Sequence, residues 1–274
     1  MYKISEIWIY PVKSLGGIRL NEAVAERRGL RHDRRWMLVD KNGQFITQRE
    51  LPEMALLQPS IGPDELVVRH SLYPDQTVII PLDITGLSPE KTSVKVWSNS
   101  VSALTMPPEI NEWFSDILHA PVHLVYMPDT SRRRADGRYA PSGQLVSFAD
   151  GFPYLIIGAS ALDELNKQLK DPVQMNRFRP NFVFSGGQAH EEDTWADIHI
   201  GSQPFRCVKP CARCVMVTTD QATAQKSAEP LKTLSQYRRR GNKVLFGQNM
   251  VWMGTEPARV REGDILEAGL KEAQ

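Results

Sequence analysis

Short apolar stretches separated by turn-forming residues run along the first third of the chain. Each stretch either alternates apolar with polar residues or is continuously apolar, and it spans only a few positions. This length predicts strands and not helices. The Asn42-Gly43 step joins two of these stretches and predicts a tight hairpin. This rhythm favours a small antiparallel sheet or barrel over alternating strand and helix units. The predicted strands cover residues 7–9, 36–39, 45–47, 66–68, 77–80, 94–97 and 101–104.

Three later segments carry apolar residues at helical spacing. The first starts after Pro107-Pro108, and the second opens at Ser160 with Asp163 predicted as its N-terminal cap. The third begins near Pro230 and ends in the arginines 238–240, which are typical of a helix C-terminus. We predict a mixed but strand-dominated second half, with a domain boundary near residue 120. In this second half, strands are expected at residues 122–126, 154–157, 182–184, 205–208, 215–219, 244–246 and 265–268.

Composition excludes several kinds of protein. The 274 residues are 41% hydrophobic and 24% charged, which is ordinary for a globular chain and unlike a disordered one. Lys and Arg (33) nearly balance Asp and Glu (32), so no overall field favours nucleic acid or an anionic membrane. No apolar run reaches the ~20 residues of a membrane-spanning helix, and the N-terminus lacks a signal-peptide core. We expect a cytoplasmic protein with no nucleic-acid or membrane partner.

The only cysteines, Cys207, Cys211 and Cys214, lie within eight residues of one another, which indicates a site and not a disulfide framework. They could also be three unrelated core residues. A structural zinc or iron–sulfur site would need a fourth ligand, for which His190 and His199 are possible donors.

Two further interpretations of the cysteines concern reactivity. Their spacing is similar to the iron–sulfur loop of radical SAM enzymes, but that loop precedes a long barrel and only residues 215–274 follow Cys214. The remaining interpretation is one functional thiolate in an exposed polar loop, activated by the neighbouring cations Arg213 and Lys209. Such a thiolate binds a soft metal or attacks a substrate.

Three cations next to predicted turns form a second set of candidates. Lys13 ends the first predicted strand, Arg34 opens another, and Arg179 precedes a third. Each taken alone is expected to be a solvated surface charge. Pro180 restricts Arg179 to extended geometry, and Asn181 adds a side-chain amide donor. Together these groups suit an anionic or heterocyclic ligand.

Six groups of residues carry a family resemblance: 7–14, 29–30 with 33–39, 178–181 with 185–186, 192–195, 211–214 with 218–220, and 245–248. In this order they resemble the MOSC family, in the branch that also has the N-terminal MOSC β-barrel domain. The resemblance implies β-barrels with packed helices, with an N-terminal MOSC β-barrel domain over residues 1–120 and a MOSC domain over 121–274. It extends to the mitochondrial amidoxime reducing component and its bacterial counterparts, which reduce N-hydroxylated compounds.

The resemblance implies a molybdenum cofactor, a molybdopterin whose metal is ligated by a cysteine. Cys214 corresponds to that ligand and is the expected catalytic residue, because dithiolene-bound molybdenum favours a further soft sulfur ligand. Cys207 has no counterpart and is expected to be structural. Backbone N–H groups are expected to contact the cofactor at the turn of Asp150 and Gly151. The residues expected to bind the cofactor are Lys13, Arg34, Asp150, Gly151, Arg179, Asn181 and Arg213.

The implied activity is reduction of a small N-hydroxylated substrate, independent of pyridoxal phosphate. Because no iron–sulfur domain is recognisable, the electrons are expected from a separate ferredoxin or flavoprotein. Such donors are usually acidic, which favours docking at Arg132–Arg134 or at Arg238–Arg240. The alternative is a cofactor-binding or sulfur-carrier protein in which Cys214 bears a persulfide.

Overall fold

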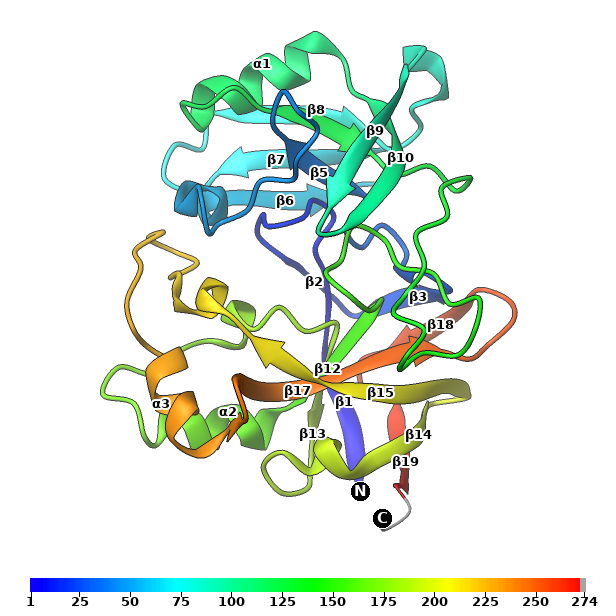
Figure 1. Cartoon of the computed structure of the whole chain (residues 1–274), viewed down its shortest axis with the longest axis vertical. Coiled ribbons are helices and arrows are strands. Elements are labelled where there is room, and N and C mark those ends of the chain that lie inside the picture. Colours follow the sequence, from blue (N-terminus) through cyan, green and yellow to red (C-terminus); the bar gives the residue numbers. More distant parts are fainter. Residues whose placement is uncertain (272–274) are drawn as a thin grey trace.

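The computed structural model describes residues 1–271, and strands dominate it. Figure 1 shows two stacked bodies, with the N-terminus and the last strand, β19, in the lower one. The upper body holds two small antiparallel sheets and helix α1 (Pro108–Ile117). Its strands are β6 (Leu57–Ile61), β7 (Glu65–His70) and β8 (Thr77–Pro81) in one sheet, and β5 (Trp36–Val39), β11 (His123–Tyr126), β10 (Asn99–Thr105) and β9 (Lys91–Val96) in the other.

The positions of apolar residues explain how strands and the helix of the upper body pack on one core. In β7, Leu66 and Val68 are buried while Val67 between them is more accessible, as expected for a strand with one face on a core. α1 presents Ile110 and Phe114, one helical turn apart, to the same core. The helix was predicted to start after Pro107-Pro108 and begins one residue earlier, at Pro108, because proline is tolerated in the first turn.

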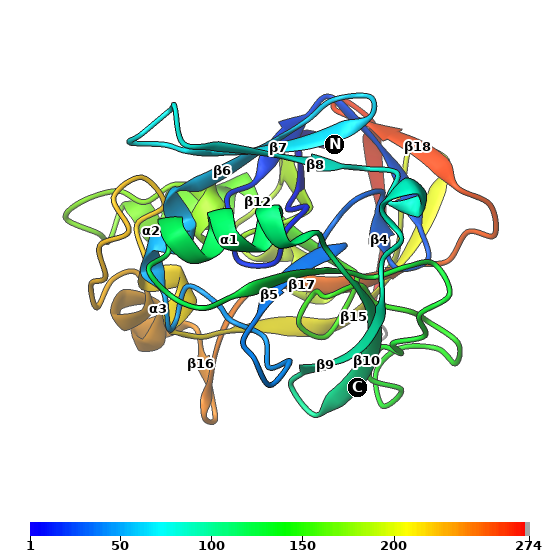
Figure 2. The ribbon, with the colours of Figure 1, turned by 90° about the horizontal axis from the view of Figure 1, so that it is seen from above.

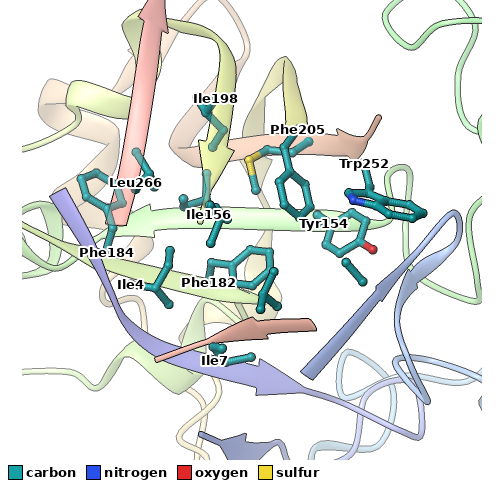
Figure 3. Packing of buried hydrophobic residues seen from close by; sticks show 14 of the residues in the cluster. Ile4, Ile7, Tyr154, Ile156, Phe182, Phe184, Ile198, Phe205, Trp252 and Leu266 are labelled. Carbon is teal, nitrogen blue, oxygen red and sulfur yellow. The ribbon is translucent and has the colours of Figure 1, made fainter. Parts of the chain in front are cut away.

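The lower body is a closed seven-stranded barrel. The strands follow in the order β12, β13, β1, β19, β14, β15, β17, and β17 pairs again with β12. Figure 3 shows large apolar side chains such as Phe182, Phe205 and Trp252 filling its interior. The strand-dominated barrel fold predicted from the sequence is confirmed. The strands are β1 (Tyr2–Ile9), β12 (Tyr154–Gly158), β13 (Phe182–Ser185), β14 (Trp195–Ile200), β15 (Gln203–Arg213), β17 (Lys243–Trp252) and β19 (Ile265–Leu270).

The first strand of the chain belongs to the lower barrel. β1 lies between β13 and β19, and β2 (Ile18–Leu20) pairs with it. β3 (Glu22–Glu26) pairs with β18 (Ala258–Arg261) and with β4 (Gly29–Leu30). Both ends of the sequence therefore build the lower body, and the loop after β1 carries Lys13 to its edge. The domain boundary near residue 120 stays a prediction.

Short elements complete the fold and correct two predictions. α2 (Ala159–Asn166) has no side-chain cap, so the prediction for Asp163 was wrong: this residue lies within the helix. The strand predicted at 45–47 is only an isolated bridge between Val39 and Phe45. No helix within residues 1–271 is long and apolar enough to cross a membrane. The other short elements are α3 (Leu231–Tyr237), β16 (Arg239–Arg240) and the 3-10 helices η1 (Pro52–Leu56), η2 (Thr85–Leu87), η3 (Met175–Arg177), η4 (Glu191–Thr194) and η5 (Val215–Thr218).

The segment around the cysteines differs from its prediction. β15 is longer than the strand expected at 205–208, so Cys207 and Cys211 lie in a strand and not in a polar loop. The strand predicted at 215–219 was wrong, since these residues form η5 and its C-cap. The Val217 N–H donates to the Cys214 carbonyl at 3.3 Å, which turns the chain directly after Cys214.

A buried carboxyl in η4 lies against β12 and β17. Glu192 is fully buried and accepts the Gly158 N–H on Oε1 at 3.4 Å. Its Oε2 has no hydrogen-bond partner within residues 1–271. Burial raises the pKa of Glu192 from 4.5 to about 7, because an unpaired carboxylate is costly away from water.

Glu192→Gln is expected to change how stability depends on pH. Because the folded-state pKa is raised, the contribution of Glu192 is fully present below pH 4.5 and is lost as the pH rises through about 7. Across that range we expect the parent to lose about 3 kcal/mol relative to Glu192→Gln. Urea unfolding at several pH values measures this, with Glu267→Gln at an exposed carboxyl as the control. Parallel profiles for parent and Glu192→Gln would contradict it.

Candidate functional site

One cavity is lined by all eight residues predicted for the site. The loop after β1 supplies Lys13, and the turn before β13 supplies Arg179 and Asn181. The end of β15 supplies Arg213, with Cys214 directly after it. The complete predicted set in this cavity is Lys13, Arg34, Asp150, Gly151, Arg179, Asn181, Arg213 and Cys214.

Tyr10 supports two of the arginines. Its ring is buried, and the guanidinium carbons of Arg34 and Arg179 lie 4.3 and 4.2 Å from the ring centroid. Both arginines have positive φ angles, 51° and 54°. The extended geometry expected for Arg179 before Pro180 was therefore wrong. Positive φ angles are uncommon in residues other than glycine and persist where the surrounding structure holds them. Here the stacking on the Tyr10 ring holds both arginines.

Arg34 is held from three sides. Its Nη1 donates to Asp33 Oδ2 at 2.6 Å and to Asn181 Oδ1 at 3.3 Å, and its Nη2 donates to the Arg179 carbonyl at 3.0 Å. Asp33 is fully buried. The Asn181 Nδ2 donates in turn to the Trp8 carbonyl at the end of β1. The Asn181 side chain is thus occupied within the protein, and it orients Arg34.

Arg179 and Arg213 each keep part of the guanidinium group unpaired. Arg179 Nη1 donates to the Leu15 carbonyl at 2.6 Å. Arg213 donates from Nε and Nη1 to the carbonyls of Phe246 and Phe178, both at 2.8 Å. In both arginines Nη2 is buried without a partner within residues 1–271. Burial also lowers the pKa of Arg179 to about 10. An anionic group in the cavity would satisfy these donors.

Lys13 and Asp150 form an ion pair in the cavity wall. The Lys13 Nζ lies 2.6 Å from Asp150 Oδ1 and 2.8 Å from the Phe148 carbonyl oxygen, so it is not a solvated surface charge. Burial lowers the pKa of Lys13, and Asp150 opposes this shift. Trp97, from the upper body, donates its indole N–H to Asp150 Oδ1 at 3.3 Å. Arg133 donates to the Asp150 carbonyl at 2.6 Å and thereby holds the backbone at Asp150 in place.

The three cysteines differ in accessibility. Cys207 is buried, which raises its pKa to about 12, and burial also raises the pKa of the half-buried Cys211. Cys214 is exposed and lines the cavity, which His190 and His199 do not. Within residues 1–271, no group of three or more His, Cys, Asp or Glu side chains is arranged to hold a metal ion.

Several cations expected on the surface are engaged elsewhere. Arg133 is buried within the 132–134 cluster. Arg238 is mostly buried and forms an ion pair with Asp193 at 2.5 Å. The Lys209 ammonium lies over the Tyr139 ring at 4.4 Å from its centroid and does not line the cavity. Both arginine clusters are therefore only partly available to a partner.

The cavity combines positive charge with the exposed thiol of Cys214, and the half-buried Cys211 also lines it. Its lining has a single carboxylate, Asp150, against five cations. Fixed cations suit a phosphate, and a thiolate suits a soft metal. The donor set therefore fits a ligand that carries both groups. The five cations are Lys13, Arg34, Arg177, Arg179 and Arg213.

Sequence reasoning missed four residues that shape this site: Tyr10, Ser14, Trp97 and Arg133. Ser14 lines the cavity with a φ of 67°. The adjacency of Tyr10 to Lys13 in Tyr-Pro-Val-Lys was a usable signal. No local pattern connects Trp97 or Arg133 with Asp150, because these contacts span 53 and 17 residues.

Comparison with known proteins identifies two domains along the chain. Residues 1–121 match the MOSC N-terminal beta barrel domain, and residues 143–267 match the MOSC domain. The Bos taurus protein "Mitochondrial amidoxime reducing component 2" is 32% identical over 244 residues, 86% of this chain and 72% of that protein.

The chain belongs to the MOSC family. "Mitochondrial amidoxime-reducing component 1" of Homo sapiens is 29% identical to this MOSC protein over 279 residues, 95% of this chain and 81% of that protein. "Molybdenum cofactor sulfurase" of Arabidopsis thaliana is 30% identical over 264 residues, 89% of this chain but 32% of that protein.

Proposed function

We propose that this MOSC protein binds the molybdenum cofactor in the described cavity and reduces small N-hydroxylated compounds with it. The observation that carries the proposal is that one positively charged cavity holds both the exposed thiol of Cys214 and buried guanidinium donors of Arg179 and Arg213 that have no hydrogen-bond partner within residues 1–271. The relatives whose names specify amidoxime reduction support the substrate class.

The chain offers separate groups for the two ends of such a cofactor. Cys214 is the proposed molybdenum ligand and catalytic residue, because it is the exposed thiol of the three. Arg179 and Arg213 donate from Nη2 to the anionic pterin part, alongside Lys13. At Gly151 an added Cβ would meet no atom within 4 Å, so the cavity is open beside its backbone.

The overall reaction breaks the N–O bond of the substrate and consumes two electrons and two protons, giving the reduced nitrogen compound and water. The bound cofactor supplies the two-electron redox chemistry. Electrons come from a separate ferredoxin or flavoprotein. Asp150 remains ionised beside Lys13 and Trp97, so it orients N–H groups of a substrate as a hydrogen-bond acceptor and does not donate a proton.

The test is to produce the protein in a host that makes the cofactor and to measure bound molybdenum, pterin fluorescence and turnover. Stoichiometric molybdenum and reduction of an aromatic amidoxime by reduced methyl viologen are expected. Metal-free protein that shows no turnover after reconstitution with the cofactor would overturn the proposal.

A second candidate is sulfur transfer through a Cys214 persulfide. Similarity to the Arabidopsis thaliana sulfurase over 89% of this chain favours it, and an exposed thiol suits it. The same preparation distinguishes the two. Cyanide-labile sulfur on Cys214 without molybdenum supports transfer, whereas molybdenum without such sulfur supports reduction.

A further inference from the structure

The short hairpin of β16 and β17 presents positive charge beside the candidate metal ligand. Of the arginines 238–240 predicted at a helix C-terminus, Arg238 is the C-cap of α3, which ends at Tyr237, whereas Arg239–Arg240 form β16. A two-residue turn at 241–242 follows, in which Gly241 has a φ of 60°. Figure 2 shows this hairpin projecting from the body of the protein.

The hairpin tip is cationic and unneutralised. Arg239, Arg240 and Lys243 are exposed, and none forms an ion pair or a side-chain hydrogen bond within residues 1–271. Arg240 and Lys243 lie directly opposite each other in the register. Like charges directly opposite destabilise a strand pair. The hairpin thus keeps an arrangement that costs stability and that an acidic partner would relieve.

Strand pairing places this tip next to Cys214. Val244 of β17 pairs with Arg213 of β15 on one side and with Arg239 of β16 on the other. Because neighbouring strands lie ~4.8 Å apart, the backbone of Arg239 is about 10 Å from that of Arg213. Cys214 follows Arg213 directly. A protein bound at the hairpin would therefore be close to the proposed metal ligand.

The rival cluster is less suited to docking. Arg133, at its centre, is buried and bound to backbone carbonyls. Arg132 and Arg134 are exposed on either side, but the nearby Arg138 is neutralised by Asp136 at 2.6 Å.

We infer that the β16–β17 hairpin, through Arg239, Arg240 and Lys243, is the docking surface for an acidic electron-transfer protein. This inference rests on the proposed reductase function, and it identifies where the donor binds. Interfaces of this kind are small and electrostatically steered, so a few unpaired cations next to the redox site suffice to guide the donor.

The test compares three double variants with equal changes in net charge. Arg240→Glu with Lys243→Glu reverses the tip while keeping like charges opposite each other, so the hairpin is no more strained than in the parent. Arg132→Glu with Arg134→Glu probes the rival cluster. Lys91→Glu with Lys95→Glu, on exposed positions of β9, controls for net charge. Each is measured for binding of a [2Fe–2S] ferredoxin at low and raised salt, and for turnover with that ferredoxin and with reduced methyl viologen.

We expect the hairpin variant alone to bind ferredoxin about tenfold more weakly at low salt, with a flatter salt dependence and an unchanged methyl viologen rate. Ferredoxin binding equal to the parent overturns the inference, as does an equal loss in the β9 control or a greater loss in the rival variant. A parallel fall in the methyl viologen rate overturns it as well. Failure of the parent with methyl viologen argues against the proposed function, while the binding measurements still decide the docking surface.

Discussion

Replacing Cys214 by alanine is expected to abolish molybdenum retention and turnover while leaving the fold intact. Cys214 is exposed, so its side chain contributes little packing, and the expected change in unfolding free energy is within about 0.5 kcal/mol. The loss arises because the other thiol in the cavity lining, Cys211, is half-buried and burial raises its pKa, so it is a poor substitute ligand. Metal analysis and turnover with reduced methyl viologen measure the effect, and thermal unfolding of the apo-protein checks the fold.

The other two cysteines are matched controls for Cys214. Burial raises the pKa of both Cys207 and Cys211, so both remain thiols near neutral pH. Cys207→Ala and Cys211→Ala are expected to keep molybdenum and measurable activity. The assignment fails if Cys214→Ala is as active as the parent, or if Cys211→Ala loses the metal instead.

Arg179→Ala is expected to weaken cofactor retention by roughly 1–3 kcal/mol, the range for a charge-assisted hydrogen bond. Burial already lowers the pKa of Arg179 to about 10, so the apo-protein bears a cost that an anionic ligand would offset. Removing the side chain also leaves the Leu15 carbonyl and the Tyr10 ring without their contacts. Cofactor remaining after dialysis, followed by pterin fluorescence, gives the measurement. Lys13→Ala and Arg34→Ala are expected to act in the same direction.

Arg177 provides the comparison for Arg179. It lines the same cavity two residues earlier, but its Nη2 already donates to Asp220 at 2.7 Å. Arg177→Ala is therefore expected to retain the cofactor better than Arg179→Ala. Equal retention in both variants and the parent would mean that neither guanidinium contacts the ligand.

Local pattern was sufficient for much of the fold. The Pro107-Pro108 step, the alternation in β7 and the apolar run of β12 identify elements near their observed positions. The same local rules failed at residues 215–219, where apolar composition suggested a strand. There the chain turns after Cys214 and forms η5. The apolar composition of these residues does not distinguish this turn from a strand.

The site residues were identified from the family resemblance, but their arrangement in space could not be predicted from it. Nothing within a few residues of Arg179 indicates that it stacks on Tyr10 or bonds to the Leu15 carbonyl, since both partners are more than 160 residues away in sequence. The positive φ of Arg179 likewise contradicts the local preference before proline. Long-range packing decided both features.

The position of β1 between β13 and β19 has a consequence for biosynthesis. Tyr2–Ile9 leaves the ribosome long before Ile265–Leu270, yet these two strands are hydrogen-bonded neighbours. The barrel cannot close before β19 has been synthesised, and pairing between strands so far apart in sequence is slow because the loop-closure entropy must be overcome first. Until then the edge of β1 that pairs with β19 stays open. Nascent chains that stall before β19 is made are therefore expected to be prone to aggregation.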